Sequence, residues 1–329
     1  MKIFVAGATG VLGRELVPEL VARGHEVVGM TRSASKQDLV RSLGARPVVA
    51  DALDPDAVAQ AVASAEPEVI VHQLTALSGE FDMRHIDRFF ETTNRLRTEG
   101  TDHLLAAGRA VGVRRFVAQS FAGWPAARTG GPVKDENAPF DPDPPEALRG
   151  MMAAIRHLEE AVLGADWLEG VVLRYGGFYG PGTTLSADPT ASHSQAILKR
   201  QFPVVGDGGG VWSFIHIADA ATATAVAVAR GERGVYNVVD DEPAAARDWL
   251  PELARALDAK PPRRVPRWLG RLMAGEAATV MMTEVRGASN QKAKHEFGWQ
   301  PQYASWRQGF AQGMTHPARS AEPSASGLG

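Results

Sequence analysis

Apolar residues recur in two alternating patterns through the first 121 positions of the chain. Short apolar runs such as 3–6 and 68–72 are rich in β-branched residues and have the length of buried strands. Between such runs, apolar residues recur at helical spacing, as Leu12, Leu16 and Leu20 do. The same reasoning predicts further strands at 25–30, 47–50 and 114–120, and helices at 36–43, 56–65 and across 84–112. Strands alternating with helices predict a parallel sheet covered on both faces.

The first strand is followed directly by GATGVLG, in which Gly7, Gly10 and Gly13 stand at GxxGxxG spacing. A glycine turn between a strand and a helix lets the backbone approach a pyrophosphate, and the first N–H groups of the helix point at the anion. A turn without a ligand is the weaker alternative, because both flanking elements are present. The sequence therefore predicts a Rossmann-type dinucleotide site formed by Gly7, Thr9, Gly10, Val11, Leu12 and Gly13.

The end of the second strand distinguishes two dinucleotides. An acidic residue there binds the free ribose 2′-OH of NAD, whereas an arginine accommodates the 2′-phosphate of NADP. No acid lies between Glu26 and Asp38, and Arg32 is present. A guanidinium binds a phosphate dianion through two parallel hydrogen bonds. We therefore predict NADP(H); a solvated loop arginine is the alternative.

The carboxyl ends of the next strands add further cofactor candidates, because open α/β sheets bind ligands at this edge. Asp51 follows the third strand, where contact with the adenine and capping of the next helix are both open. Ala52 and, after the fourth strand, Leu74 are also predicted to contact the cofactor. The acidic cluster at 51–56 lacks the glycine and distal glutamate of a calcium loop, so no metal is predicted.

Composition excludes several other classes of function. The 329 residues carry a formal net charge of −3, which does not favour nucleic acid or an anionic membrane as a partner. No apolar run approaches the length of a membrane span, and no signal peptide is visible. The absence of cysteine excludes disulfides, thiolate metal sites and a cysteine nucleophile, and is consistent with a cytoplasmic protein.

Several stretches resemble the NAD-dependent epimerase/dehydratase type of extended short-chain dehydrogenase/reductase. They are GATGVLG, the Asp51–Asp54 pair, EGTDHLLAAGRAVGVRRFVAQS, LRYGGFYGPG, SFIHIADAA, GVYNVVDDEP and FGWQP. The resemblance implies a nucleotide-binding domain at 1–177, with returns near 211–240, and a smaller α/β substrate domain at 178–210 and 241–316. It places the active site between the two domains. The tail at 317–329 is predicted to be disordered, and a homodimer formed through 84–112 and 148–163 is plausible.

The resemblance also implies catalytic roles. The family's hydroxyl at the end of the fifth strand corresponds to Ser120, but its Tyr-x-x-x-Lys pair is absent. One alignment places Met152 and Arg156 at these positions, with Arg156 left to bind the nicotinamide ribose. Shifting by one residue gives Met151 and Ile155. By spacing from Gly100–Thr101, Arg97 stands where the family has an asparagine.

Other groups must then supply a proton, if one is needed. Tyr175 and Tyr179 lie in the loop that the family places beside the nicotinamide, and His193 lies in a polar stretch that can cover the cleft. We therefore predict an NADPH-dependent reductase acting on a small, fairly apolar carbonyl or a related C=C or C=N group. Sugar-nucleotide epimerisation or dehydration and a non-catalytic NADP(H) sensor or scaffold are the alternatives.

Overall fold

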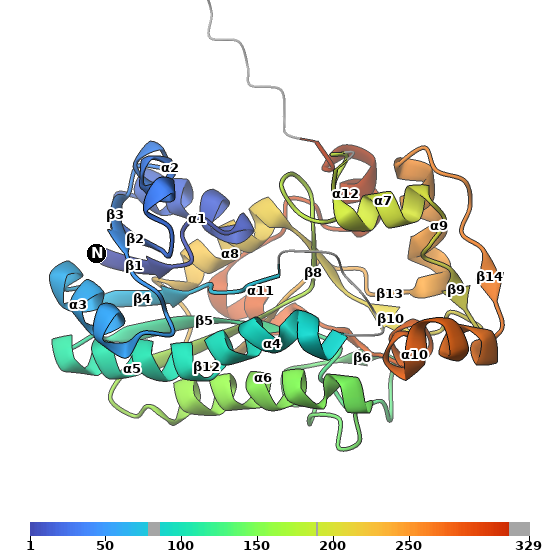
Figure 1. The fold of residues 1–329 in the computed structure, drawn as a ribbon, viewed down its shortest axis with the longest axis horizontal. Coiled ribbons are helices and arrows are strands. Elements are labelled where there is room, and N and C mark those ends of the chain that lie inside the picture. Colours follow the sequence, from blue (N-terminus) through green and yellow to red (C-terminus); the bar gives the residue numbers. More distant parts are fainter. Residues whose placement is uncertain (78–85, 189, 316–329) are drawn as a thin grey trace, which may run out of the picture.

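The computed structural model describes residues 1–77, 86–188 and 190–315, so the predicted tail lies outside the described residues. A seven-stranded sheet forms the centre of the molecule (Figure 1), with the strand order β12-β7-β5-β4-β1-β2-β3. All of its neighbouring strands are parallel. The strands are β1 (Lys2–Ala6), β2 (Glu26–Thr31), β3 (Arg46–Val49), β4 (Val69–His72), β5 (Arg115–Phe121), β7 (Glu169–Tyr175) and β12 (Gly234–Val238). The predicted doubly wound α/β fold is confirmed.

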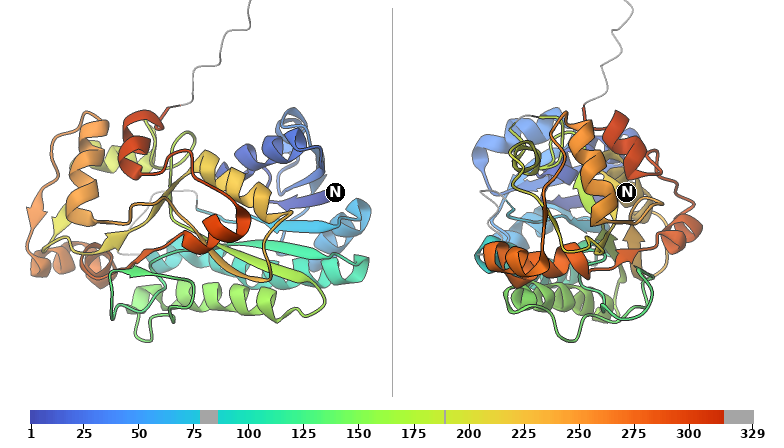
Figure 2. Two further views of the ribbon diagram at one scale, coloured as in Figure 1. Left: turned by 180° about the vertical axis from the view of Figure 1, so that it is seen from behind. Right: turned by 90° about the vertical axis from the view of Figure 1, so that its right-hand side faces the viewer.

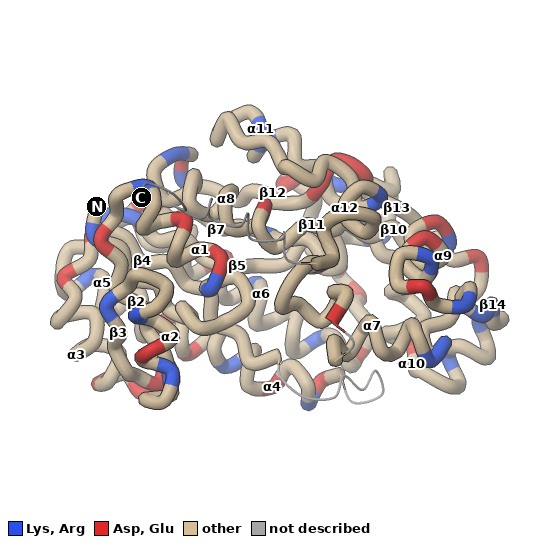
Figure 3. The backbone as a smooth tube through the Cα atoms, turned by 90° about the horizontal axis from the view of Figure 1, so that it is seen from above, with Lys and Arg blue, Asp and Glu red and all other residues tan. Residues whose placement is uncertain are grey.

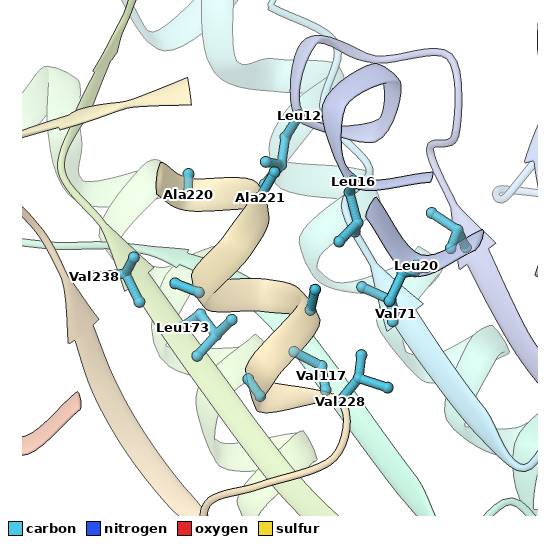
Figure 4. Packing of buried hydrophobic residues seen from close by; sticks show 14 of the residues in the cluster. Leu12, Leu16, Leu20, Val71, Val117, Leu173, Ala220, Ala221, Val228 and Val238 are labelled. Atoms are coloured by element: carbon cyan, nitrogen blue, oxygen red, sulfur yellow. The ribbon is translucent and has the colours of Figure 1, made fainter. Parts of the chain in front are cut away.

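Two helical layers enclose this sheet. On one face, α1 (Val11–Ala22) packs with α8 (Ile217–Ala227), and Figure 4 shows Leu12 of α1 beside Ala221 of α8 and Leu20 of α1 beside Val71. Small side chains on α8 allow the two helices to approach closely. The opposite face is covered by α3 (Pro55–Ala65), α5 (Glu99–Val111) and α6 (Glu146–Gly164). Two further helices, α2 (Gln37–Ser42) and α4 (Ile86–Arg97), follow β2 and β4.

Side chains along a strand alternate between these two layers, and this alternation decides which residues reach the site. On β5, Val117 belongs to the core beneath α1 and α8, whereas Ala118 belongs to the core beneath α6. Leu173 and Val172 of the paired strand β7 divide in the same way. Gln119 and Phe121 therefore face the opposite way from Ser120.

Most of the remaining elements gather at the end of the molecule away from α2 and α3 (Figures 1 and 2), whereas the helix at Gln291–Phe297 packs against β12 and α8. Their strands pair in short two-stranded sheets: β8 (Gly177–Tyr179) with β11 (Phe214–His216), β9 (Val204–Val205) with β14 (Arg264–Val265), β10 (Val211–Trp212) with β13 (Ala244–Ala245), and β6 (Val133–Lys134) with β15 (Gly287–Ala288). Their helices are α7 (Ser192–Leu198), α9 (Ala246–Ala256), α10 (Arg267–Thr283), α11 (Gln291–Phe297) and α12 (Trp306–Gln312). Within the described ranges, no helix combines the length and apolar character needed to cross a bilayer.

Candidate active site

A cavity of about 1110 Å³ runs from the glycine turn after β1 to the helices α7, α9 and α10. Pockets for drug-sized ligands have volumes of about 300–1,000 Å³, so this one has room for a dinucleotide together with a small second molecule. The cavity lies outside the carboxyl ends of β1, β2 and β4, where open α/β sheets bind nucleotides.

The glycine turn has the geometry of a pyrophosphate cradle. Gly7 has φ +97°, and a Cβ atom there would lie 2.6 Å from the carbonyl oxygen of Gln73. α1 begins at Val11, and its N-cap residue Gly10 has no side chain to satisfy the first N–H groups of the helix. Gly7, Thr9, Gly10, Val11 and Leu12 all line the cavity. These residues fit a dinucleotide, with its phosphates on the free N–H groups.

Gly13 differs from the other residues predicted in the glycine turn, because it does not line the cavity. A Cβ atom at this position would lie 2.3 Å from the carbonyl oxygen of Gly7. Gly13 therefore lets α1 pack against the turn, and its effect on a cofactor is indirect.

The end of the cavity beside β2, β3 and β4 contains the residues predicted from the strand ends. Arg32 and Lys36 line it after β2, and the nearest acid in sequence, Asp38, pairs with Arg41 at 2.6 Å. Asp51 also lines it and accepts a hydrogen bond from the Leu53 N–H at 3.0 Å. Ala52 and Leu74 complete this wall. No acid among the described residues forms an ion pair with Arg32, and an unpaired guanidinium can bind a phosphate group.

Ser120 does not lie in the cavity, which corrects the role expected for it. Its side chain faces α6, where its hydroxyl donates to Oε1 of Glu159 at 2.6 Å. Glu159 also accepts two hydrogen bonds from Arg174, at 2.8 and 2.6 Å, and lies only 4% exposed. The alternation along β5 places Gln119 and Phe121 at the cavity instead.

The helix α6 presents no acid–base pair where the family has Tyr-x-x-x-Lys. Met151 lines the cavity and Ile155, one turn later, is fully buried, whereas Met152 does not line the cavity. The structure of α6 therefore supports the alignment that places Met151 and Ile155 at the family's tyrosine and lysine positions. Arg156 lies outside the cavity with its guanidinium 5.1 Å from the ring centre of Phe140, so its expected contact with the nicotinamide ribose is wrong.

Two of the three predicted proton donors reach the cavity. Tyr175 lines the cavity, but its hydroxyl lies 2.6 Å from Oγ1 of Thr224 and accepts a hydrogen bond from Nε2 of Gln73 at 3.4 Å. Burial also raises the pKa of the Tyr175 phenol far above its ordinary value. His193 also lines the cavity, with Nδ1 2.9 Å from Oγ1 of Thr184, and burial lowers its pKa. The imidazole is therefore neutral at pH 7.

Tyr179 is fully buried in another core and does not line the cavity, which corrects its predicted catalytic role. Its ring packs edge-on against Phe310, and burial raises its pKa. Alternation along β8 explains the placement, because the preceding residue, Phe178, faces the cavity.

The structure adds two features to the site. One is an aromatic wall, in which Trp124 lies 5.3 Å from Trp212 and Trp212 lies 5.0 Å from Trp249, measured between ring centres. The other is Arg97, which lines the cavity although it is only 5% exposed. A signal for Arg97 exists in the sequence: Ile86, Phe90, Thr93 and Arg97 are spaced i, i+4, i+7, i+11, on one buried helical stripe.

Comparisons with known proteins agree with this geometry. The profile of the "NAD dependent epimerase/dehydratase family" matches residues 3–239. A Streptomyces protein named 3-diazoavenalumate denitrifying reductase is 46% identical over 95% of this chain and 100% of its own length. A ketoreductase of a farnesyl dihydroquinoline oxide from Stigmatella aurantiaca is 31% identical over 76% of this chain and 71% of its own. The crystal structure of Thermus thermophilus UDP-glucose 4-epimerase with NAD is 26% identical, with a TM-score of 0.71, over 95% of this chain and 98% of that one.

Proposed function

The chain belongs to the NAD dependent epimerase/dehydratase family, and we propose that it is an NADPH-dependent reductase whose substrate accepts hydride without a proton from the protein. The family supports a nicotinamide dinucleotide, and Arg32 supports the phosphorylated form. A bound nicotinamide dinucleotide supplies the hydride. The cavity extends beyond the cofactor residues to the aromatic wall, which supports a reductase over a sensor without a substrate pocket.

The observation that carries the proposal is the chemistry at the two family positions on α6. Met151 and Ile155 have no exchangeable proton. Tyr175 is engaged by Thr224 and Gln73 and has a raised pKa, so it is a poor proton donor near neutral pH. Reduction of a ketone requires protonation of the resulting alkoxide, and the described residues offer little means to do it.

An aryl diazonium group avoids this requirement. The electron pair of the hydride forms the new C–H bond, and the pair of the C–N bond leaves with N₂, so that Ar–N₂⁺ and H⁻ give Ar–H and N₂. The name of the Streptomyces relative describes removal of nitrogen from a diazo compound. We therefore propose a diazo-bearing aromatic acid as the substrate class, with the aromatic ring against Trp124, Trp212 and Trp249.

Ketone reduction is the second candidate, because the Stigmatella relative is named as a ketoreductase. In this chain it would require Tyr175, His193 or water as the proton source. Epimerisation and dehydration are less well supported, since transient oxidation of a sugar hydroxyl requires a base at the position of Met151.

The test follows isotopes through the reaction. Purified protein is incubated with NADPH deuterated at C4 and 4-carboxybenzenediazonium, and the rate is compared with the same mixture lacking protein. We expect N₂ release above that background and benzoate with deuterium at the carbon that carried nitrogen. Turnover of ketones with no turnover of the diazonium salt would contradict the proposal and support the second candidate.

Tyr175→Phe sharpens the choice between the two reactions. It removes the phenol hydroxyl and keeps the ring, so we expect the diazonium rate to change less than twofold. A phenol that supplied a proton would contribute roughly 10²–10⁴-fold, and a fall of that size would contradict proton-free reduction.

A further inference from the structure

Arg97 carries a positive charge that nothing in the described part of the chain neutralises. It is the last residue of α4, it is 5% exposed, and it lines the cavity. Its Nη1 atom is buried without a hydrogen-bond partner among the described residues, and no described acid forms an ion pair with it. The guanidinium lies over the face of Phe90, with the Cζ atom of Arg97 5.9 Å from the ring centre.

The imidazole of His72, which lies near Arg97, is already engaged at both ring nitrogens. Nδ1 of His72 accepts from the Leu74 N–H at 3.2 Å, and Nε2 lies 3.1 Å from Oγ1 of Thr101. Burial lowers the pKa of His72 to about 4, so this ring is neutral at pH 7. Burial also lowers the pKa of Arg97, to about 10, which leaves the guanidinium protonated at pH 7. A buried, unpaired charge is unfavourable unless a ligand compensates it.

The cavity as a whole is suited to anions. Acidic and basic residues are interspersed along the backbone (Figure 3), but the Lys, Arg, Asp and Glu side chains that line the cavity are mostly basic. Among the described residues they are Arg32, Lys36, Arg97, Lys199, Arg200 and Arg263, against one acid, Asp51. The glycine turn and Arg32 already account for the phosphates of the cofactor, which leaves Arg97 without an anion.

We propose that Arg97 binds a carboxylate of the substrate inside the cavity. A planar guanidinium fits a carboxylate through two parallel hydrogen bonds. The guanidinium contacts Phe90, and the cavity lining also includes the apolar Leu74 and Leu96, which suits the hydrocarbon body of a small organic acid rather than a hydrated phosphate. Phe90 shares an apolar cluster with Met151 and Ile155, so the charge lies close to the positions of the missing family pair. This inference deepens the proposed function and rests on it for a small aromatic acid as the ligand.

The test measures binding rather than turnover, so failure of the diazonium reaction would leave it intact. The probes are 4-hydroxycinnamate and its methyl ester, titrated by calorimetry into the full-length protein saturated with NADP⁺. We expect wild type to bind the acid at least tenfold more tightly than the ester. Arg97→Met should abolish that difference, Arg97→Lys should keep part of it, and Arg263→Met, at the exposed far wall, should keep it all.

A thermal readout separates ligand binding from a structural role. Because Arg97→Met removes an unpaired buried charge, its Tm without ligand should equal or exceed that of wild type. Three results would overturn the inference: acid and ester binding wild type equally, neither probe binding, or Arg97→Met weakening NADP⁺ while the preference for acid persists. A Tm that falls by several degrees would show a structural role instead.

Discussion

The position of Ser120 yields a sharp test, because its two possible roles predict opposite results. The family resemblance makes it a hydrogen-bond donor to substrate, whereas the structure directs its hydroxyl to Glu159, away from the cavity. Ser120→Ala deletes the hydroxyl and little else. We expect the variant to lose stability and keep its activity.

The size of the loss follows from the hydrogen bonds around Glu159. A hydrogen bond to a charged acceptor contributes about 1.5–3 kcal/mol. The carboxylate keeps both bonds from Arg174 in the variant, so the lower end applies, about 1.5 kcal/mol. For the 329 residues of this chain that corresponds to a decrease in Tm of roughly 2 °C. Glu159→Gln, which leaves the largely buried Arg174 without its counter-charge, should cost about 3–5 kcal/mol.

The assay combines thermal unfolding with steady-state kinetics on the same preparations. We expect kcat/KM of Ser120→Ala within twofold of wild type once both proteins are folded. Removal of an oxyanion-binding donor lowers kcat by roughly 10²–10³-fold. A fall of that size with an unchanged Tm would refute the structural role of Ser120 and restore the family role.

Two further predictions concern the cofactor and pH. Arg32→Met should weaken NADPH binding roughly tenfold, about 1.5 kcal/mol, and leave NADH binding unchanged, because only NADPH has a 2′-phosphate. Fluorescence titrations measure both affinities. Equal losses for the two nucleotides would contradict the role of Arg32 in binding the 2′-phosphate. Burial lowers the pKa of His72 from 6.5 to about 4, so the unfolded chain takes up the proton first as pH falls. Its contribution, about 3 kcal/mol, is complete above pH 6.5 and is lost toward pH 4. Urea unfolding at pH 7 and 4.5 should show a smaller difference in His72→Asn than in wild type, and an equal difference would refute the reasoning.

The fold and the cofactor end of the site were predictable because their signals are local. Strand, glycine turn and helix follow one another within the first 22 residues, and the structure places β1, the turn and α1 there. Arg32, Asp51 and Leu74 were placed by the rule that parallel strands present their carboxyl ends at one edge. Gly13 was the exception, since a glycine required for helix packing has the same spacing as one that contacts a ligand.

The residues of the reaction centre were harder to predict because the face on which a side chain lies depends on its exact position in the strand or helix. A shift of one residue along a strand reverses the face of a side chain, which separates Ser120 from Gln119 and Phe121, and Tyr179 from Phe178. On α6, one residue turns a side chain by about 100°, which separates Arg156 from Ile155. Motif spacing locates such residues along the chain but does not determine the face on which they lie.

The two proposals constrain one another through charge. A diazonium cation entering a cavity that already holds the buried guanidinium of Arg97 would be repelled, and more strongly than in water because the surroundings are apolar. A carboxylate on the same molecule removes the conflict, since it pairs with Arg97 and makes the substrate neutral overall. The diazonium group must then point away from Arg97, into the wider part of the cavity. A diazonium salt without a carboxylate should consequently react more slowly with wild type than 4-carboxybenzenediazonium does, and Arg97→Met should reverse that order.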